Sequence, residues 1–266
     1  MKFNFKEKMK ENLPLWLLHT YPIIKRRSDI SRFKDIHLGE TCVVIGNGPS
    51  LNQVDFNQLR KFVTFGVNGI FYKTKELGFI PDYYVVEDSA VMKDNVEEIV
   101  KFRAKKASFF PVNYKGYFSD RQDQFFFRLD RRFYEKKSYS YEIPQFSKDC
   151  NNRIFCNQSV TFINIQLASY MGFKKILLVG MDHNYSIPDS HVISGNKILS
   201  TTDDPNHFHP SYFGPGKTWH DPKLHNVELS YKFFKICIES MGGEIINCTE
   251  GGKLEVFRRE ELNKFI

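Results

Sequence analysis

The sequence predicts an α/β protein with a Rossmann-like, doubly wound and mostly parallel sheet. Short apolar runs of strand length, such as 41–45, 62–67 and 175–179, alternate with stretches of helical spacing. This alternation is typical of parallel strands whose connecting helices cover both faces of a sheet. Glycine or polar residues follow each of these runs, and ligands in such sheets bind where the strands end. We therefore expect a binding site at the carboxyl edge of the sheet.

Composition limits the classes of protein to which the chain can belong. Its 266 residues suffice for one large domain or two small ones. Hydrophobic residues make up 41% of the chain and include 26 Phe, so we expect a globular fold with aromatic core and pocket walls. The net charge of +7 suits an anionic ligand or surface but is too diffuse to indicate a nucleic-acid partner. The cysteines number five and form no C-x-x-C pair, which favours reduced thiols in a cytoplasmic protein.

The predicted main domain, 39–258, follows an N-terminal helical extension, 1–38, and precedes a C-terminal tail, 259–266. The N-terminal residues are charged and lack an apolar signal region. The run 13–24 is apolar, shorter than the ~18 residues of a membrane span, and flanked by basic residues. It either packs on the domain or makes a peripheral contact with an anionic membrane face. We therefore expect a cytoplasmic protein, with the inner face of the membrane as an open alternative.

The turn after the first strand, Gly-Asn-Gly-Pro-Ser from Gly46 to Ser50, is the first candidate site. Glycines let backbone N–H groups approach a ligand, and a helix start favours negative charge, so the turn can cradle a phosphate. An ordinary strand-to-helix turn with Ser50 as its N-cap has the same sequence. Leu51 replaces the third glycine of a dinucleotide fingerprint, and the next strand ends at Asn68 instead of an acid. Because no Gly-Lys-Ser/Thr follows either, NAD and P-loop ATP sites are both disfavoured.

The later elements are predicted from the same two signals, apolar runs of strand length and apolar residues at helical spacing. The first half is predicted to contain a helix at 50–61, strands at 62–67 and 82–86, a helix at 90–105 and a short strand at 107–111. Residues 112–150 do not continue this alternation of strands and helices and are interpreted as an inserted flap. The basic run 128–137 within the flap is interpreted as a solvated face. The second half is predicted to contain a strand at 154–156, a helix at 159–171 ending at Gly172, a strand at 175–179, a helix at 222–241 and a strand at 244–247.

Residues 184–222 form a long predicted loop, and a stretch of this length in a compact domain is usually a lid or a binding loop. It contains His207, His209 and His220, and a histidine, with a pKa of about 6.5, suits the role of a general base. Asp203 and Asp204 in the same loop are interpreted as a solvated pair. The aromatic residues of the loop include Tyr185, Tyr212 and Trp219.

A set of motifs, taken in order, gives the sequence a family resemblance. They are Ile45-Gly-Asn-Gly-Pro-Ser-Leu51, Thr64-Phe-Gly-Val-Asn68, Pro81-Asp-Tyr-Tyr with Glu87-Asp88, Ser159-Val-Thr, Tyr170-Met-Gly-Phe-Lys174, Val179-Gly-Met-Asp-His-Asn-Tyr185, His207-Phe208, Trp219-His220 and Gly251-Gly-Lys-Leu-Glu-Val-Phe257. Over about 40–258 they resemble the MptE-like domain family of 6-hydroxymethylpterin diphosphokinases and motility-associated-factor glycosyltransferases. The same skeleton is similar to the small bacterial sialyltransferases that use CMP-sialic acid.

The resemblance implies a GT-A-like Rossmann fold with a flexible lid, and transfer of a CMP-activated, sialic-acid-like sugar to a glycan or protein acceptor. It implies no obligatory metal cofactor, with Mg²⁺ left open, and a lid histidine as base. Together with the strand-end residues, the nucleotide-binding candidates are Gly46, Asn47, Gly48, Pro49, Ser50, Asn68, Asp88, Ser159, Thr161, Gly180, Asp182 and His183. The catalytic candidates are His207, His209 and His220, and the substrate-binding candidates are Tyr185, Tyr212 and Trp219. Two positions depart from the sialyltransferase pattern: Asp88 stands for an Asn, and Ser159-Val-Thr stands for Thr-Ser-Gly.

Two alternatives remain open. The chain could be a pterin or nucleoside diphosphokinase that uses Mg-ATP, with Asp88 and Asp182 on the metal and Lys217 from the lid on a phosphate. It could also be a non-catalytic nucleotide-binding module at a membrane assembly, although such a module needs no candidate base. Several of the candidates also have plain structural roles: Asp182 and His183 can stabilise their own turn, and Trp219 can simply pack.

Overall fold

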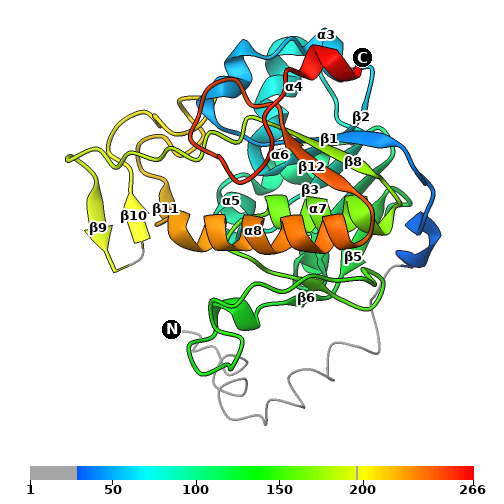
Figure 1. Cartoon of the computed structure of the whole chain (residues 1–266). Helices are drawn as coiled ribbons and strands as arrows, with labels where there is room; N and C mark the ends of the chain where they lie inside the picture. The colour runs from blue at the N-terminus through cyan, green and yellow to red at the C-terminus, as the bar shows by residue number, and fades with distance from the viewer. Residues whose placement is uncertain (1–28, 196) are drawn as a thin grey trace.

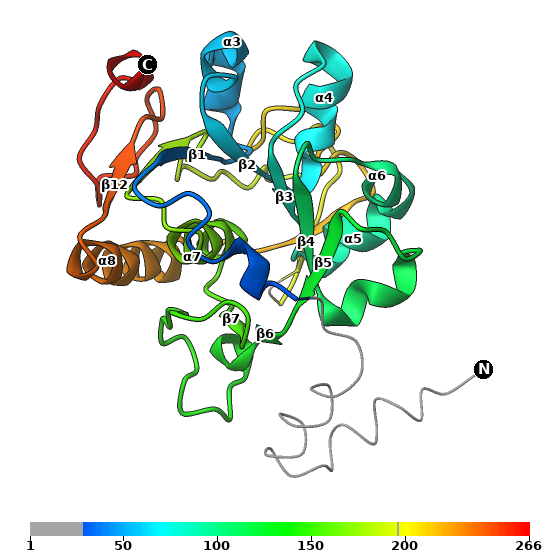
Figure 2. The same cartoon turned by 90° about the vertical axis from the view of Figure 1, so that its right-hand side faces the viewer.

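A computed structural model describes residues 29–195 and 197–266, and it has the predicted α/β architecture (Figures 1 and 2). Within these residues a parallel sheet of seven strands runs in the order β12-β8-β1-β2-β3-β4-β5. Its strands are β1 (Thr41–Ile45), β2 (Val63–Val67), β3 (Tyr83–Val85), β4 (Ala107–Pro111), β5 (Gln124–Phe127), β8 (Lys175–Val179) and β12 (Glu244–Asn247). The chain leaves β1 toward β2 and later returns to the other side of β1 as β8. Strand order therefore reverses between β1 and β8, the place where such sheets bind ligands.

Two hydrophobic cores lie on the two faces of the sheet, because successive residues of a strand point to opposite sides. In β1, Val44 packs into one core and Val43 into the other. The helices α7 (Thr161–Tyr170) and α8 (Leu224–Ser240) supply the first core, and Figure 2 shows both of them on one side of the sheet. The other core is covered by α3 (Phe56–Leu59), α4 (Phe71–Leu77), α5 (Ser89–Asp94) and α6 (Val96–Lys101).

Two predicted helices are broken, because polar side chains bond to the nearby backbone and compete with helical hydrogen bonds. The segment 50–61 forms a 3₁₀ turn, η2 (Pro49–Gln53), and then the short α3, whose N-cap Asp55 accepts a hydrogen bond from Asn57 N. The segment 90–105 is divided into α5 and α6 at Asn95, whose amide donates to the Val91 carbonyl. Other short 3₁₀ turns are η1 (Ser31–Phe33), η3 (Asn68–Ile70), η4 (Val112–Tyr117), η5 (Arg132–Tyr134) and η6 (Leu262–Phe265).

The segment 112–150 is less irregular than its sequence suggests. Its β5 joins the main sheet as the edge strand beside β4, because four consecutive residues, Gln124–Phe127, are buried there. Further along, β6 (Leu129–Asp130) pairs in parallel with β7 (Ile154–Phe155). This small pair carries the chain from the edge of the main sheet back toward the ends of its strands.

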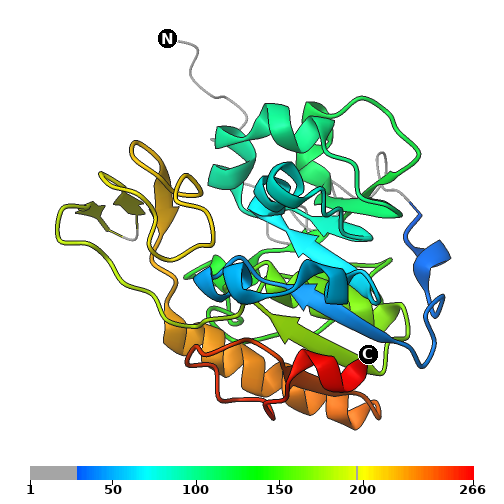
Figure 3. The same cartoon turned by 90° about the horizontal axis from the view of Figure 1, so that it is seen from above.

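The predicted lid, 184–222, also contains regular structure. The strands β9 (Val192–Ser194), β10 (Lys197–Leu199) and β11 (Thr218–His220) form a small antiparallel sheet that projects from the main body in Figures 1 and 3. Its buried side is anchored by Ile198 and Trp219, which belong to the second core. The lid is therefore a small folded unit in contact with the strand ends.

The described part of the N-terminal extension packs on the domain. Ile30 and Phe33 lie in the first core, and His37 hydrogen-bonds the Tyr83 hydroxyl at 2.8 Å. The apolar run 13–24 lies outside the described residues, so its predicted contact stays a prediction. Among the helices that the structure describes, none is long and apolar enough to cross a membrane. All five cysteines are free thiols.

Candidate functional site

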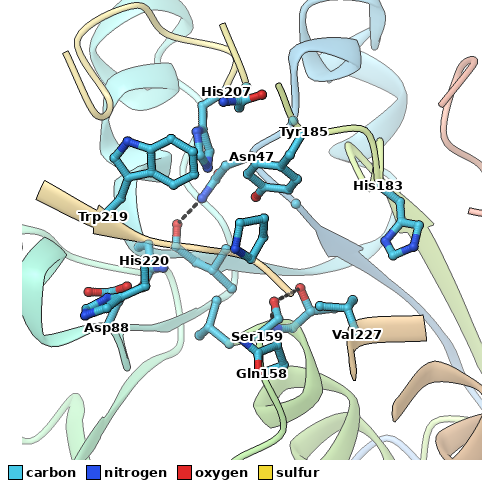
Figure 4. A pocket seen from close by; sticks show the side chains of 18 of the residues that line it. Asn47, Asp88, Gln158, Ser159, His183, Tyr185, His207, Trp219, His220 and Val227 are labelled. Carbon is cyan, nitrogen blue, oxygen red and sulfur yellow. Dashed lines mark hydrogen bonds between the residues drawn. The ribbon is translucent and has the colours of Figure 1, made fainter. Parts of the chain in front are cut away.

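A pocket of about 380 Å³ opens at the carboxyl edge of the sheet, where strand order reverses. Its walls come from the ends of β1, β2, β3 and β8, from the first turns of α7 and α8, and from the lid (Figure 4). Most of the residues proposed from the sequence line it. These are Gly46, Asn47, Gly48, Asn68, Asp88, Ser159, Thr161, Gly180, Asp182, His183, Tyr185, His207, Tyr212, Trp219 and His220.

The glycine turn is packed against the end of β8. The Asp182 carboxylate accepts hydrogen bonds from the Ser50 backbone N (3.1 Å) and the Ser50 hydroxyl (2.7 Å). A Cβ on Gly48 would overlap the same carboxylate, so this close approach requires glycine. The negative charge at the start of η2 is therefore supplied by the protein's own Asp182 carboxylate. Pro49 and Ser50 do not line the pocket, and the cradle predicted there is filled by Asp182.

Two asparagines at the ends of β1 and β2 present unpaired acceptors. The Asn47 amide nitrogen donates to the Val67 carbonyl (3.1 Å) and the Tyr212 hydroxyl (3.0 Å). The Oδ1 atoms of Asn47 and Asn68 are buried and have no hydrogen-bond partner among the described residues. Asn68 has a positive φ of 44°, a conformation that Asn tolerates better than most residues. A buried, unpaired carbonyl is costly, so a ligand that donates hydrogen bonds here would be favoured.

The acids at the end of β3 have different environments. Asp88 caps α5, because its Oδ1 accepts from Ala90 N (2.7 Å) and Val91 N (3.1 Å). Glu87 is buried in the pocket wall, and burial raises its pKa to about 7, with Arg131 opposing that shift and Asp88 adding to it. In the sequence, Glu87 stands out only as the end of a predicted strand. The sequence signal that could have indicated Glu87 as a site residue is its position directly before Asp88.

The lid places an Asp–His pair over the pocket. His207 Nδ1 lies 2.7 Å from Asp204 Oδ2, and the His207 ring stacks on Tyr212 with ring centroids 4.1 Å apart. Asp204 is buried and also accepts from the Phe213 backbone N, so its interpretation as a solvated carboxylate is wrong. Burial alone would raise the pKa of Asp204, but the hydrogen bonds from His207 and the backbone lower it. An ionised Asp204 fixes the orientation of the His207 ring.

The lid is attached to the glycine turn through its backbone. Phe208 N donates to the Asn47 carbonyl (2.9 Å), and the Asn52 amide donates to the Phe208 carbonyl (3.0 Å). These two bonds hold the residue next to His207 against the floor of the pocket.

The other lid candidates separate into two groups. His220 lines the pocket, as does Trp219, whose indole N–H donates to the Ser200 hydroxyl (3.1 Å). His209 does not line it: the ring stacks on Tyr72 and faces Glu76 at 3.8 Å. Lys217 is also directed elsewhere. Its ammonium donates to the carbonyls of Ser211 (2.7 Å) and Tyr212 (3.1 Å).

The pocket also contains residues that no sequence pattern indicated. They include Arg131, Tyr134, Gln158, Asn206, Lys223 and Tyr231. Lys223 forms an ion pair with Glu142 at 2.6 Å, which ties the start of α8 to the segment 112–150. Arg131 belongs to the basic run 128–137, so one member of that run faces the site instead of bulk solvent.

No cluster of three or more His, Cys, Asp or Glu residues within 29–195 and 197–266 has the arrangement of a metal site. The two carboxylates considered for Mg²⁺ already have partners within the protein: Asp88 accepts from the backbone N atoms of Ala90 and Val91, and Asp182 accepts from the backbone N and the hydroxyl of Ser50. They belong to the ends of different strands, β3 and β8, with β1 and β2 between them in the sheet.

Comparison with known proteins relates the chain to a family and to a solved structure. The family model described as "6-hydroxymethylpterin diphosphokinase MptE-like" matches residues 16–188. Among solved structures, the MAf glycosyltransferase from Magnetospirillum magneticum AMB-1 is similar, with a TM-score of 0.50 and 15% identity over 90% of this chain and 35% of that one. This chain therefore spans about a third of that protein, and the likeness shows a shared fold. A search of the curated proteins found no match.

Proposed function

This chain belongs to the MptE-like family, and from that premise we propose that it is a glycosyltransferase. The donor would be a nucleotide-activated sugar, in the first instance a CMP-linked, sialic-acid-like one. The acceptor would be a hydroxyl of a glycan or glycoprotein. The fold it shares with the MAf glycosyltransferase supports this proposal.

The observation that carries the proposal is the Asp204–His207 pair. Because Asp204 holds Nδ1 at 2.7 Å, the remaining nitrogen, Nε2, is the atom available to take a proton. A lid histidine oriented by a buried carboxylate matches the requirement of glycosyl transfer, in which an acceptor hydroxyl must be deprotonated as it attacks. A protein that only binds a nucleotide needs no candidate base.

The pocket floor would hold the nucleotide. The unpaired Oδ1 atoms of Asn47 and Asn68 can accept hydrogen bonds from ribose hydroxyls or from the amino group of a base. Tyr185 and Tyr212 belong to the lid and line the pocket, and their hydroxyls can donate to the departing phosphate. We propose that the reaction has no obligatory metal and takes place in the cytoplasm, with the inner membrane face as the alternative location.

The name of the family supports a second candidate, a pterin diphosphokinase that uses Mg-ATP. That reaction needs carboxylates on the metal and cations on the phosphates. The positions of Asp88, Asp182 and Lys217 do not favour it, because each already has protein partners.

Thermal unfolding with CMP, CDP, UDP, GDP and ATP, each with and without Mg²⁺, separates the candidates. A ligand at ~100 times its Kd adds about 2.7 kcal/mol to the free energy of unfolding. Stabilisation by CMP without metal supports the glycosyltransferase. Stabilisation by Mg-ATP alone would replace it with the kinase, and no response to any nucleotide would contradict both.

A further inference from the structure

Four side chains from different elements meet at the wall of the pocket, and all of them except Cys156 line it. Glu87 follows β3, Arg131 follows β6, Tyr134 lies in η5, and Cys156 follows β7. The Arg131 guanidinium lies 3.9 Å from Glu87 Oε1 and 5.9 Å from the centroid of the Tyr134 ring. The Cys156 thiol lies 3.9 Å from the same Glu87 oxygen. Parallel pairing of β6 with β7 brings the residues after them, Arg131 and Cys156, to one place.

Arg131 differs from its neighbour Arg132. The Arg132 guanidinium is bonded to Asp130 through Nε (2.9 Å) and a terminal nitrogen (2.7 Å), and to the Tyr139 hydroxyl (2.8 Å). Arg131 makes no hydrogen bond through its side chain within the described part of the chain, and 44% of that side chain is exposed. Its ion pair with Glu87 is long. Arg131 is therefore a cation that faces the pocket with its donors unused, next to a buried acid.

We propose that Arg131 binds an anionic group of the substrate and that Glu87 takes up a proton as it does so. The anion is a carboxylate or a phosphate, and its source is either an acidic sugar or the nucleotide. The inference rests on the proposed function only for the choice of nucleotide and sugar probes.

Proton uptake follows from the groups that face Glu87. The attractive charge is Arg131, while Asp88 is repulsive, and the remaining neighbours are the Cys156 thiol and the hydroxyls of Tyr114 and Tyr134. Burial already holds the pKa of Glu87 at about 7, so near neutral pH the carboxyl is partly protonated. An anion on Arg131 cancels the one charge that stabilises ionised Glu87. The carboxyl then binds a proton, and anion affinity rises as pH falls through about 7.

Isothermal titration calorimetry at pH 7 tests the inference, with inorganic pyrophosphate, CMP and N-acetylneuraminate as probes. Two buffers of different ionisation enthalpy report the protons taken up. We expect Arg131→Gln to weaken at least one probe about 10-fold or more, the effect of losing a charge-assisted hydrogen bond. The matched control is Lys137→Gln, which removes the same charge from the same basic run outside the pocket and should change affinity less than 2-fold. Glu87→Gln should bind without proton uptake.

The probes identify the source of the anion. If Arg131→Gln loses affinity only for N-acetylneuraminate, Arg131 binds a sugar carboxylate. If the variant loses affinity for CMP and pyrophosphate, Arg131 binds a phosphate. If wild-type protein ignores CMP but binds another probe through Arg131, the nucleotide of the proposed function is wrong and this inference stands. Equal affinity in Arg131→Gln for every probe, no binding of any probe to wild type, or no proton uptake would overturn it. Should Arg131→Gln fail to fold, the double variant with Glu87→Gln removes both charges together.

Discussion

Asp204 holds His207 in a fixed orientation, and under the proposed function that orientation is what lets His207 act as the base. The carboxylate is buried, accepts from the ring and from the Phe213 backbone N, and stays ionised because those bonds lower its pKa. A histidine in a lid without such a partner would be free to rotate. The pair is thus oriented before any acceptor arrives, which is what a general base requires.

Replacing the base tests this geometry at the level of one residue. We expect His207→Ala to lower turnover about 10²- to 10⁴-fold with donor affinity nearly unchanged, since the ring acts on the acceptor. Asp204→Asn should lower turnover less. The control is His209→Ala in the same lid, whose ring stacks on Tyr72 outside the pocket. Steady-state kinetics with the donor identified by thermal shift is the measurement, and full turnover in His207→Ala would remove it from this role.

Glu87 predicts a dependence of stability on pH. Burial raises its pKa from the ordinary value of 4.5 to about 7 in the folded protein, so folding favours the protonated form. The stabilisation is complete below pH ~4.5 and is lost as pH rises to about 7, a loss on the order of 3 kcal/mol. Glu87→Gln, which cannot ionise, should therefore unfold at a higher temperature than wild type at pH 8 and at a similar temperature at pH 5. Thermal melts at the two pH values provide the check, and an equal difference at both would contradict the assignment.

At the scale of elements, the turn between β1 and η2 depends on its contact with the end of β8. A Cβ on Gly48 would overlap the Asp182 carboxylate, while the backbone itself has an ordinary φ of −68°. We expect Gly48→Ala to cost about 1–3 kcal/mol of stability by overpacking. In the double variant with Asp182→Ala the two costs should not add, because the closest clash disappears with the carboxylate and only the Gly180 carbonyl, at 2.9 Å, remains. Urea unfolding of the four proteins measures the coupling, and strict additivity would argue against the contact.

The lid is a second element with a specific anchor. The side-chain nitrogen of Asn52 donates to the Phe208 carbonyl at 3.0 Å, and the side-chain Oδ1 of Asn52 accepts from the Lys73 ammonium at 2.7 Å. Asn52→Ala should release the segment 203–213 more readily, at a cost of about 1 kcal/mol in that local opening. Hydrogen exchange followed by mass spectrometry should show roughly 5-fold faster exchange there, with α7 as the internal control. Unchanged exchange in the lid would show that this bond does not hold it.

At the scale of the whole molecule, the sheet was predictable because its strands are short apolar runs followed by glycine or polar residues. Periodicity located β1, β2 and β8, and strand ends located Asn47, Asn68 and Asp182 at one edge. These signals are local in sequence. They act through the fixed direction of parallel strands, so they also predicted which residues would meet.

What escaped prediction depends on contacts between distant segments. Arg131 reaches Glu87 only because β6 and β7 pair, and each is two residues long, too short for a periodic signal. Asp204 looked solvated because nothing in the loop sequence indicates that it is buried against Phe213. Ser50 looked like a phosphate ligand because its true partner, Asp182, follows more than a hundred residues later.

The backbone bond from Phe208 to Asn47 joins the roof of the pocket to its floor. Under the proposed function, a nucleotide bound at Asn47 would be enclosed by Phe208, the residue next to the catalytic base His207. The nucleotide could leave only after the backbone bond between Phe208 and Asn47 breaks. Donor and acceptor would then follow a compulsory order, with the nucleotide product departing last. Product inhibition by the free nucleotide would be competitive toward the donor and noncompetitive toward the acceptor.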